Sequence, residues 1–169
     1  MKRDELRDAQ RPLKERYRDS PDAALLTLRA DGELGSEAVS CSVETGRALV
    51  EAGLHPASGG DGMLACSGDM LLQALVACAG VTLRSVAVNR SLEVSGRVVA
   101  EGDLDFRGTM GVDREAPVGF TAIRLRFELD SEAGDEELEA LLETTERYCV
   151  VYQTLAGGVP LEVSRSASR

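Results

Sequence analysis

The clearest pattern in the chain is a run of about twenty residues, 69–88, in which apolar side chains occupy nearly every side of a helix. A helix that is apolar all round is buried, and this length reaches roughly 30 Å through a small domain. The segment therefore predicts a buried central helix. A membrane span is the alternative, but Gly80, Arg84 and the polar interruptions argue against it. These interruptions are Gln73, Thr82, Arg84 and Ser85.

A second helix is predicted from Gly134 to Gly157, with Asp135 as a plausible N-cap and acidic residues in its first turn. Its apolar stripe has the three- and four-residue spacing of an amphipathic helix and places Cys149 on the inner face. The stripe is Leu138, Leu141, Leu142, Thr145, Tyr148, Cys149 and Tyr152.

The remaining chain has strand-like patterns separated by turns. Strands are expected at residues 24–29, 39–43, 92–100, 102–111, 120–129 and 159–163, and residues 39–43 and 47–50 could form a hairpin. Residues 54–68, rich in glycine, form a long loop, and long loops in compact domains are often functional. Two helices among hairpin-spaced strands predict an α+β fold.

Composition limits the possible partners. The chain has 169 residues, enough for one domain with a core, and a formal net charge of −10. Such a surface repels nucleic acid and anionic lipid, so neither is an expected partner. Residues 1–20 form a highly charged helix or arm without the apolar core of a signal peptide. We therefore divide the chain into this arm and a domain at 21–169, and expect a cytoplasmic protein.

The four cysteines, at positions 41, 66, 78 and 149, are candidates for redox chemistry. In a reducing compartment they are expected as thiols, and one histidine in the chain makes a mixed zinc site improbable. A buried cysteine is most often a small apolar residue, which is the favoured interpretation of Cys41. Cys66, in the loop, is more exposed. The spacing of apolar residues alone does not show whether Cys78 and Cys149 are redox-active or only small buried residues.

Two segments resemble a known family. The stretch GGDGMLACSGDMLLQALVACAGVTLRSVA is similar to the signature of the OsmC/Ohr family (osmotically inducible and organic hydroperoxide resistance proteins), and ERYCVVYQTL followed by GVPLEV resembles its second-cysteine helix and last strand. The likeness covers about residues 24–165. It implies an intertwined homodimer in which antiparallel sheets wrap around two long central helices, with the active sites at the interface.

The resemblance also implies a thiol peroxidase. Cys78 would be the thiolate that attacks an organic hydroperoxide and becomes a sulfenic acid, and Cys149 would condense with it to a disulfide. A dithiol or lipoyl-type reductant would restore both thiols, without a metal or other cofactor. The thiolate needs a nearby cation. We expect Arg47, in preference to Arg29, held by Asp69, although Asp69 could instead be only a helix N-cap.

The chain departs from the family pattern at three positions. Asp69 stands where many relatives have Glu, Ser67 where Pro commonly precedes the acidic residue, and Val150 where Pro follows the second cysteine. Without that proline the second helix need not break at Cys149, which puts the approach of the two sulfurs in question. His55 could line the pocket or lie on the surface.

Two other functions stay open, the first because of these departures and the second because of the charged residues 1–19. The chain could be a non-catalytic protein of the same fold that binds a small apolar ligand or senses oxidants. It could also be an interaction protein that uses its charged arm.

Overall fold

The computed structural model describes residues 3–5, 8, 10–12, 19–20, 32–34, 40–44 and 49–166, and leaves out the side chains of 32–34 and 40–44. The strand expected at 24–29, Arg29 and Arg47 lie outside the described residues. So does the boundary between the arm and the domain, which stays a prediction.

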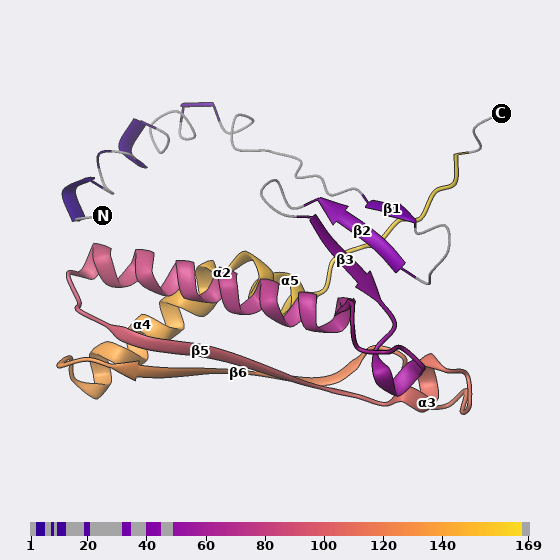
Figure 1. Cartoon of the computed structure of the whole chain (residues 1–169). Helices are drawn as coiled ribbons and strands as arrows, with labels where there is room; N and C mark the ends of the chain where they lie inside the picture. Colours follow the sequence, from indigo (N-terminus) through magenta and orange to yellow (C-terminus); the bar gives the residue numbers. More distant parts are fainter. Residues whose placement is uncertain are drawn as a thin grey trace.

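The described chain forms two small sheets around a central helix (Figure 1). The first sheet has the order β1-β2-β3-β4, and the hairpin of β2 with β3 confirms the pairing expected near residues 39–50. The second sheet is the antiparallel pair β5-β6. Helices α2, α4 and α5 complete a mixed helix and strand architecture, so the α+β fold class is confirmed. The strands are β1 (Gly32–Leu34), β2 (Ser40–Glu44), β3 (Leu49–Gly53), β4 (Ala65–Cys66), β5 (Ser95–Leu104) and β6 (Phe120–Asp130), and the helices are η2 (Pro56–Ser58), α2 (Ser67–Arg90), α3 (Phe106–Thr109), α4 (Asp135–Tyr148) and α5 (Val150–Gly157).

Strand β5 corrects the expectation of two strands at 92–100 and 102–111. It is continuous through Gly102, because this glycine is a packing position and not a turn. A Cβ atom at Gly102 would lie 2.4 Å from a ring carbon of Phe120. The strand ends at Leu104, and Asp105 caps the short helix α3 by accepting a hydrogen bond of 3.0 Å from the Arg107 N–H group.

Helix α2 has one buried face. Leu75, Ala79, Leu83 and Ala87, spaced four residues apart, are its buried side chains. Val81 on another face is 73% exposed. Burial on every side, as predicted from the sequence, therefore does not occur within the single chain.

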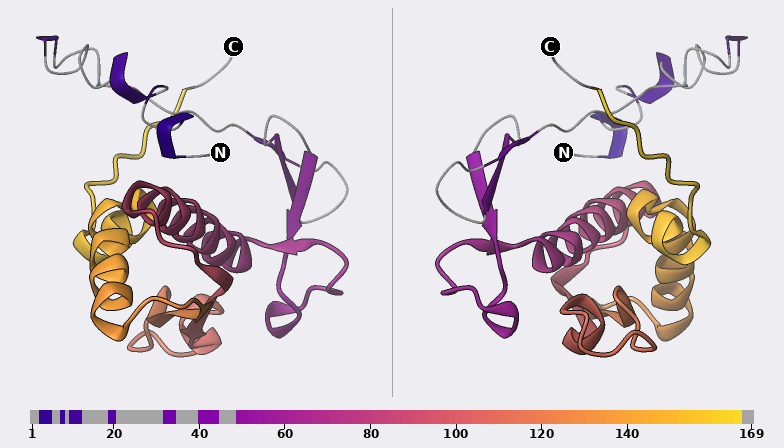
Figure 2. Two further views of the ribbon diagram at one scale, coloured as in Figure 1. Left: turned by 90° about the vertical axis from the view of Figure 1, so that its left-hand side faces the viewer. Right: turned by 90° about the vertical axis from the view of Figure 1, so that its right-hand side faces the viewer.

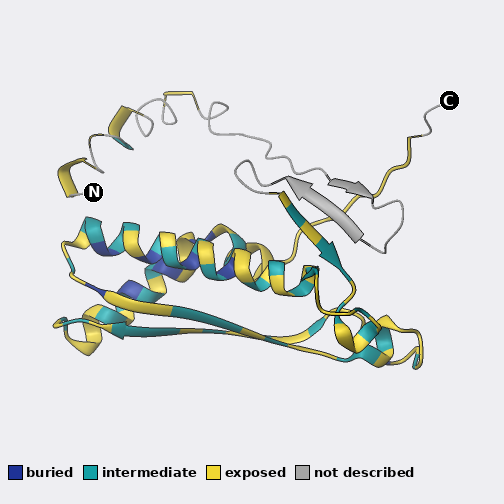
Figure 3. Ribbon diagram, in the orientation of Figure 1, coloured by how far each residue is buried: buried dark blue, intermediate teal, exposed yellow. Residues whose placement is uncertain are grey.

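By length and composition α2 could cross a membrane. It packs instead against β5, α4 and α5 as the central helix of the domain (Figures 1 and 2). The core lies where α2 and α4 meet over the sheet (Figure 3). Its buried members are Leu83, Ala87, Val94 and Leu141.

Two helix starts and the last strand also differ from the expectations. The N-cap of α2 is Cys66 and not Asp69, and the N-cap of α4 is Gly134 and not Asp135. Residues 159–163 form no strand within the described structure. A strand needs a neighbour for its backbone groups, and the described chain pairs none with this segment. Its apolar side chains are exposed, with Val163 99% accessible.

Candidate functional site

The sequence predicted one helix from Gly134 to Gly157, but the structure has two helices there, α4 and α5, which meet at Cys149. Helix α4 ends at Tyr148, α5 begins at Val150, and Cys149 between them has an extended backbone with φ −76° and ψ 108°. Cys149 is 1% exposed, which confirms that it faces inward. The expectation that the helix need not break without a proline was therefore wrong for this chain.

Hydrogen bonds across the junction explain how the helix breaks without proline. The last bond of α4 runs from the Cys149 N–H to the Thr145 carbonyl at 2.9 Å, and the first of α5 from the Gln153 N–H to the Cys149 carbonyl at 2.9 Å. The carbonyl of Glu146 would take the Val150 N–H in a continuous helix. It accepts instead the side-chain amide of Gln153 at 2.9 Å. The Glu146 carbonyl therefore keeps a hydrogen-bond partner although the helix is broken.

The break brings the first turn of α5 and both thiols together. Cys78 lies within α2, and its sulfur is in hydrogen-bonding contact with the thiol of Cys149. Both are free cysteines, with Cys78 half-buried. The N–H groups of the first turn of a helix have no partner within that helix. Those of Val150 and Val151 act on the Cys78 thiol and lower its pKa.

These contacts separate the acidities of the two thiols. Burial acts to raise the pKa of Cys78, but hydrogen bonds to its thiolate outweigh burial and bring the pKa below its ordinary value. The groups that lower it are the Val151 N–H, the Cys149 thiol and the Val150 N–H. The Thr82 hydroxyl donates to the Cys78 carbonyl at 2.8 Å. Burial, together with the neighbouring Cys78 thiolate, raises the pKa of Cys149. Cys78 is thus the better nucleophile and Cys149 the proton-bearing partner.

A cavity of about 370 Å³ lies between α2, α5 and the start of β6, and neither cysteine lines it. Leu75, one turn before Cys78, and Tyr152, one turn after Cys149, are in its wall. The other lining residues are Phe120, Thr121, Ala122, Ile123, Leu155 and Ala156. The cavity can therefore receive a small molecule about one helical turn from each cysteine.

Asp69 lies apart from the cysteines. Nine residues separate it from Cys78 along α2, which is about 13.5 Å of rise and a rotation of about 900°, placing the two on opposite sides of the helix. Its neighbours are His55 and Cys66, with which it lines a cavity of about 380 Å³. Within the described residues the structure does not bring Asp69 to Cys78, and its site role stays a prediction, like that of Arg47.

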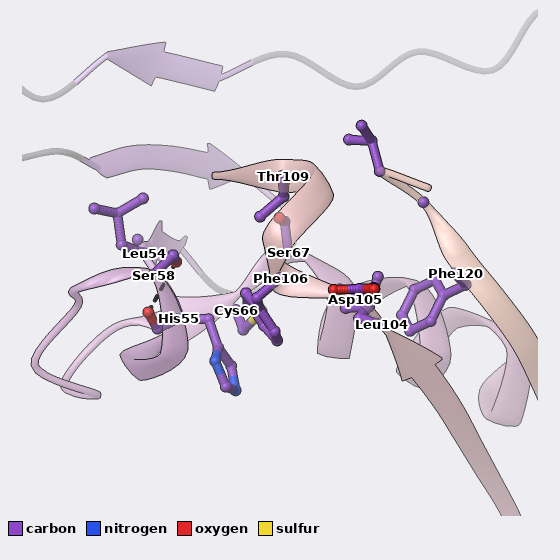
Figure 4. A pocket seen from close by; sticks show the side chains of 14 residues that line it. Leu54, His55, Ser58, Cys66, Ser67, Leu104, Asp105, Phe106, Thr109 and Phe120 are labelled. Carbon is purple, nitrogen blue, oxygen red and sulfur yellow. Dashed lines mark hydrogen bonds between the residues drawn. The ribbon is translucent and has the colours of Figure 1, made fainter. Parts of the chain in front are cut away.

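The segment 54–68 is not the uninterrupted loop expected from the sequence, because it contains η2 and β4 and its last two residues begin α2. Together with residues of β5, α3 and β6 it lines a third cavity, of about 310 Å³, around His55 and Cys66 (Figure 4). The His55 ring stacks on Phe106 with centroids 5.0 Å apart, and its Nδ1 accepts from the Ala57 N–H at 3.0 Å. In neutral His55 the proton is therefore on Nε2. Sequence reasoning named His55 and Cys66 individually but gave no signal that they share a cavity with Phe106.

The sequence matches the family described as OsmC-like protein over residues 60–164. The chain belongs to the OsmC-like family. No curated protein has a significantly similar sequence.

Solved structures share the fold at low sequence identity. An OsmC-like protein from Mycoplasma pneumoniae is 17% identical with a TM-score of 0.65, and the match covers 79% of this chain and 89% of that one. An organic hydroperoxide resistance protein OsmC from Legionella pneumophila is 19% identical with a TM-score of 0.57, covering 79% and 92%. The sequence match confirms the family, and the solved structures confirm the OsmC-like fold of the single chain.

Proposed function

We propose that this OsmC-like protein is a thiol peroxidase that reduces organic hydroperoxides through Cys78 and Cys149. The observation that carries the proposal is the contact between the two thiols at the break between α4 and α5, where the pKa of Cys78 is lowered and that of Cys149 is raised. The name of the Legionella relative, an organic hydroperoxide resistance protein, supports the same chemistry.

The reaction uses each thiol once. The Cys78 thiolate attacks the terminal oxygen of the hydroperoxide, the O–O bond breaks, and the alkoxide leaves as the alcohol after taking a proton from solvent, so that Cys78 becomes a sulfenic acid. The Cys149 sulfur then attacks the Cys78 sulfur, and the thiol proton leaves with the sulfenic hydroxyl as water. A dithiol or lipoyl-type reductant exchanges with the disulfide and is itself oxidised to a cyclic disulfide.

The cavity lined by Leu75 and Tyr152 supports an organic substrate. Leu75, Ile123 and Leu155 in its wall would contact the carbon part of an alkyl or aryl hydroperoxide bound one helical turn from Cys78. The deep contact between the thiols also lets the disulfide form without a large movement of either helix.

A homodimer would complete both the core and the site. Exposed apolar residues remain on α2, among them Val81, and along residues 159–163, which pair with no strand of the described chain. The resemblance places the active sites at a subunit interface. Because Asp69 faces away from Cys78 of its own chain, it can act on a thiolate only across that interface, where it would hold Arg47 beside the partner's cysteine. We place this dimer in the cytoplasm.

Mixed dimers test the assignment of Asp69. A dimer of one Cys78→Ser subunit and one Asp69→Asn subunit keeps a complete site only if Asp69 acts across the interface. About half the wild-type turnover is then expected, whereas action within one chain leaves both sites defective.

A thiol count by mass spectrometry tests the peroxidase itself. One equivalent of cumene hydroperoxide should convert Cys78 and Cys149 together to a disulfide that dithiothreitol reverses, and Cys66→Ser should behave like wild type. A Cys78 that remains a thiol in excess peroxide would sink the proposal.

The cavity around His55 and Cys66 favours a second candidate, a non-catalytic ligand-binding protein. Cys66 precedes Cys78 by twelve residues, about 18 Å along a helix, so a ligand bound there is remote from the thiol pair of the same chain. This function predicts binding of a small apolar molecule without consumption of peroxide, measurable by calorimetry with Cys78→Ser as the control.

A further inference from the structure

The cavity of about 310 Å³ at the start of α2 has a histidine in its wall that the surrounding chain holds in one position. The His55 ring stacks on Phe106 with an interplanar angle of 27°, and its Nδ1 accepts the Ala57 N–H at 3.0 Å. The other ring nitrogen, Nε2, has no partner among the described residues. Because the ring is fixed on one side by stacking and at Nδ1 by a hydrogen bond, the Nε2–H group is a preoriented donor.

The backbone around His55 is also constrained. The His55 carbonyl accepts from the Ser58 N–H at 2.8 Å, the Gly60 N–H at 3.1 Å and the Ser58 hydroxyl at 2.9 Å (Figure 4). Gly59 ends η2 with a φ of 96°, and a Cβ atom at Gly60 would lie 1.7 Å from the Leu54 carbonyl oxygen. This turn packs no core, since η2 has no buried residue. Its constraints instead fix one side chain at a cavity wall, as in a preorganised binding site.

Most of the remaining wall is apolar and stays accessible. Leu54, Leu104 and Val118 line the cavity and are exposed, the last at 64%, and the rings of Phe106 and Phe120 lie between them. Small-molecule sites are hollows of roughly 300–1,000 Å³ with mostly hydrophobic and aromatic walls and a few placed polar groups. The cavity fits the lower end of that range, so its walls suit the body of one small aromatic molecule.

The charged groups at the cavity favour a neutral ligand. Among the described residues that line it there is one aspartate, Asp105, and no lysine or arginine. Asp105 is already paired, with Nη2 of Arg107 at 2.6 Å from its Oδ2. Asp69 lines the adjoining cavity and adds a second negative charge nearby. A carboxylate ligand would therefore meet two acids and no free cation, whereas an uncharged oxygen can accept from the His55 Nε2–H.

We propose that this cavity binds a small, neutral aromatic molecule through a carbonyl oxygen, which accepts the Nε2–H of His55 while the aromatic ring packs on the apolar wall. The inference deepens the second candidate function and rests on it only for the choice of cavity. It adds the class of ligand and the residue that selects it. The site is separate from the thiol pair, so binding is expected whether or not Cys78 reduces a peroxide.

Two substitutions test the donor and the space separately. His55→Phe keeps a ring that can stack on Phe106 but has no N–H group. Gly68→Ala adds a Cβ atom 3.5 Å from the Phe120 ring and 3.6 Å from the Cys66 sulfur, which are ordinary contact distances, and alanine is the better helix former. This variant should therefore fold at least as stably as wild type while taking space from the cavity. Gly157→Ala, in α5 and with no atom within 4 Å of the new Cβ, is its control.

The measurement is a fluorescence titration of the full chain with three probes of one shape. They are 2-acetonaphthone, 2-isopropenylnaphthalene, in which a methylene group replaces the carbonyl oxygen, and the anion 2-naphthoate. Wild type should bind the ketone about tenfold more tightly than the hydrocarbon, the order expected for one hydrogen bond, and more tightly than the anion. His55→Phe should bring the ketone-to-hydrocarbon ratio to about one, and Gly68→Ala should weaken ketone binding about threefold or more. Gly157→Ala should match wild type.

The ratio of two affinities is a readout that general loosening of the fold does not change. A ratio that survives in His55→Phe, tighter binding of 2-naphthoate than of the ketone, or no saturable binding of the ketone would each overturn the inference. Cys78→Ser should bind the ketone like wild type. Because peroxide chemistry is followed by the thiol count and ligand binding by fluorescence, failure of the peroxidase proposal and failure of this inference are distinguishable.

Discussion

Cys78 and Cys149 lie in direct hydrogen-bonding contact, although one is within a long helix and the other is in the break between two shorter ones. Burial acts in the same direction on both cysteines, because it raises the pKa of each thiol. Hydrogen-bonding groups around Cys78 outweigh burial and lower its pKa, whereas burial and the Cys78 thiolate prevail at Cys149 and raise its pKa. The pair is therefore asymmetric before any substrate arrives.

This asymmetry predicts different pH profiles for the two thiols. Because hydrogen bonds lower the pKa of Cys78, its alkylation should become fast below the pH at which an ordinary cysteine reacts. Because burial and the Cys78 thiolate raise the pKa of Cys149, its alkylation should require a higher pH. Site-resolved mass spectrometry with iodoacetamide measures both, and the reverse order would contradict the assignment of the nucleophile.

Removal of Cys149 should trap the first product of the reaction. In Cys149→Ala, one equivalent of cumene hydroperoxide should leave a sulfenic acid on Cys78, because no thiol is in contact with it to form the disulfide. Dimedone should then add once per chain, at Cys78. Wild type should give almost no adduct, and an adduct at Cys66 in place of Cys78 would identify a different peroxidatic residue.

Gly102→Ala should destabilise the fold. The added Cβ would lie 2.4 Å from the Phe120 ring, so the ring or the strand must shift, at a cost of about 1–3 kcal/mol. Gly119→Ala, beside the same phenylalanine and with no atom within 4 Å of the new Cβ, is the control. Urea unfolding at fixed protein concentration gives both values, and equal stability of the two variants would contradict the packing role of Gly102.

Leu141→Ala should be costly, because Leu141 is 0% exposed between α4 and α2. Loss of a buried leucine from a core typically reduces the free energy of unfolding by about 2–5 kcal/mol. Leu155→Ala, at a side chain 38% exposed, should cost less. The urea midpoint at constant chain concentration provides the measurement, and a loss at Leu141 no larger than at Leu155 would argue against this core.

The sequence by itself determined the large elements and the chemistry to look for. The nearly continuous apolar run predicted the helix that became α2, and three- and four-residue spacing predicted that Cys149 faces inward, because periodicity records which side of an element is buried. The family likeness selected Cys78 and Cys149 from four cysteines. The α+β class followed from strand and helix patterns alone.

Tertiary structure decided what depends on neighbours distant in sequence. Gly102 looked like a break until the Phe120 ring was placed against it, and residues 159–163 alternate like a strand but have no partner in the described chain. Cys149 lies at a break that Gln153, and not a proline, supports. Backbone hydrogen bonds and close packing depend on where two segments meet, and periodicity within one segment does not contain that information.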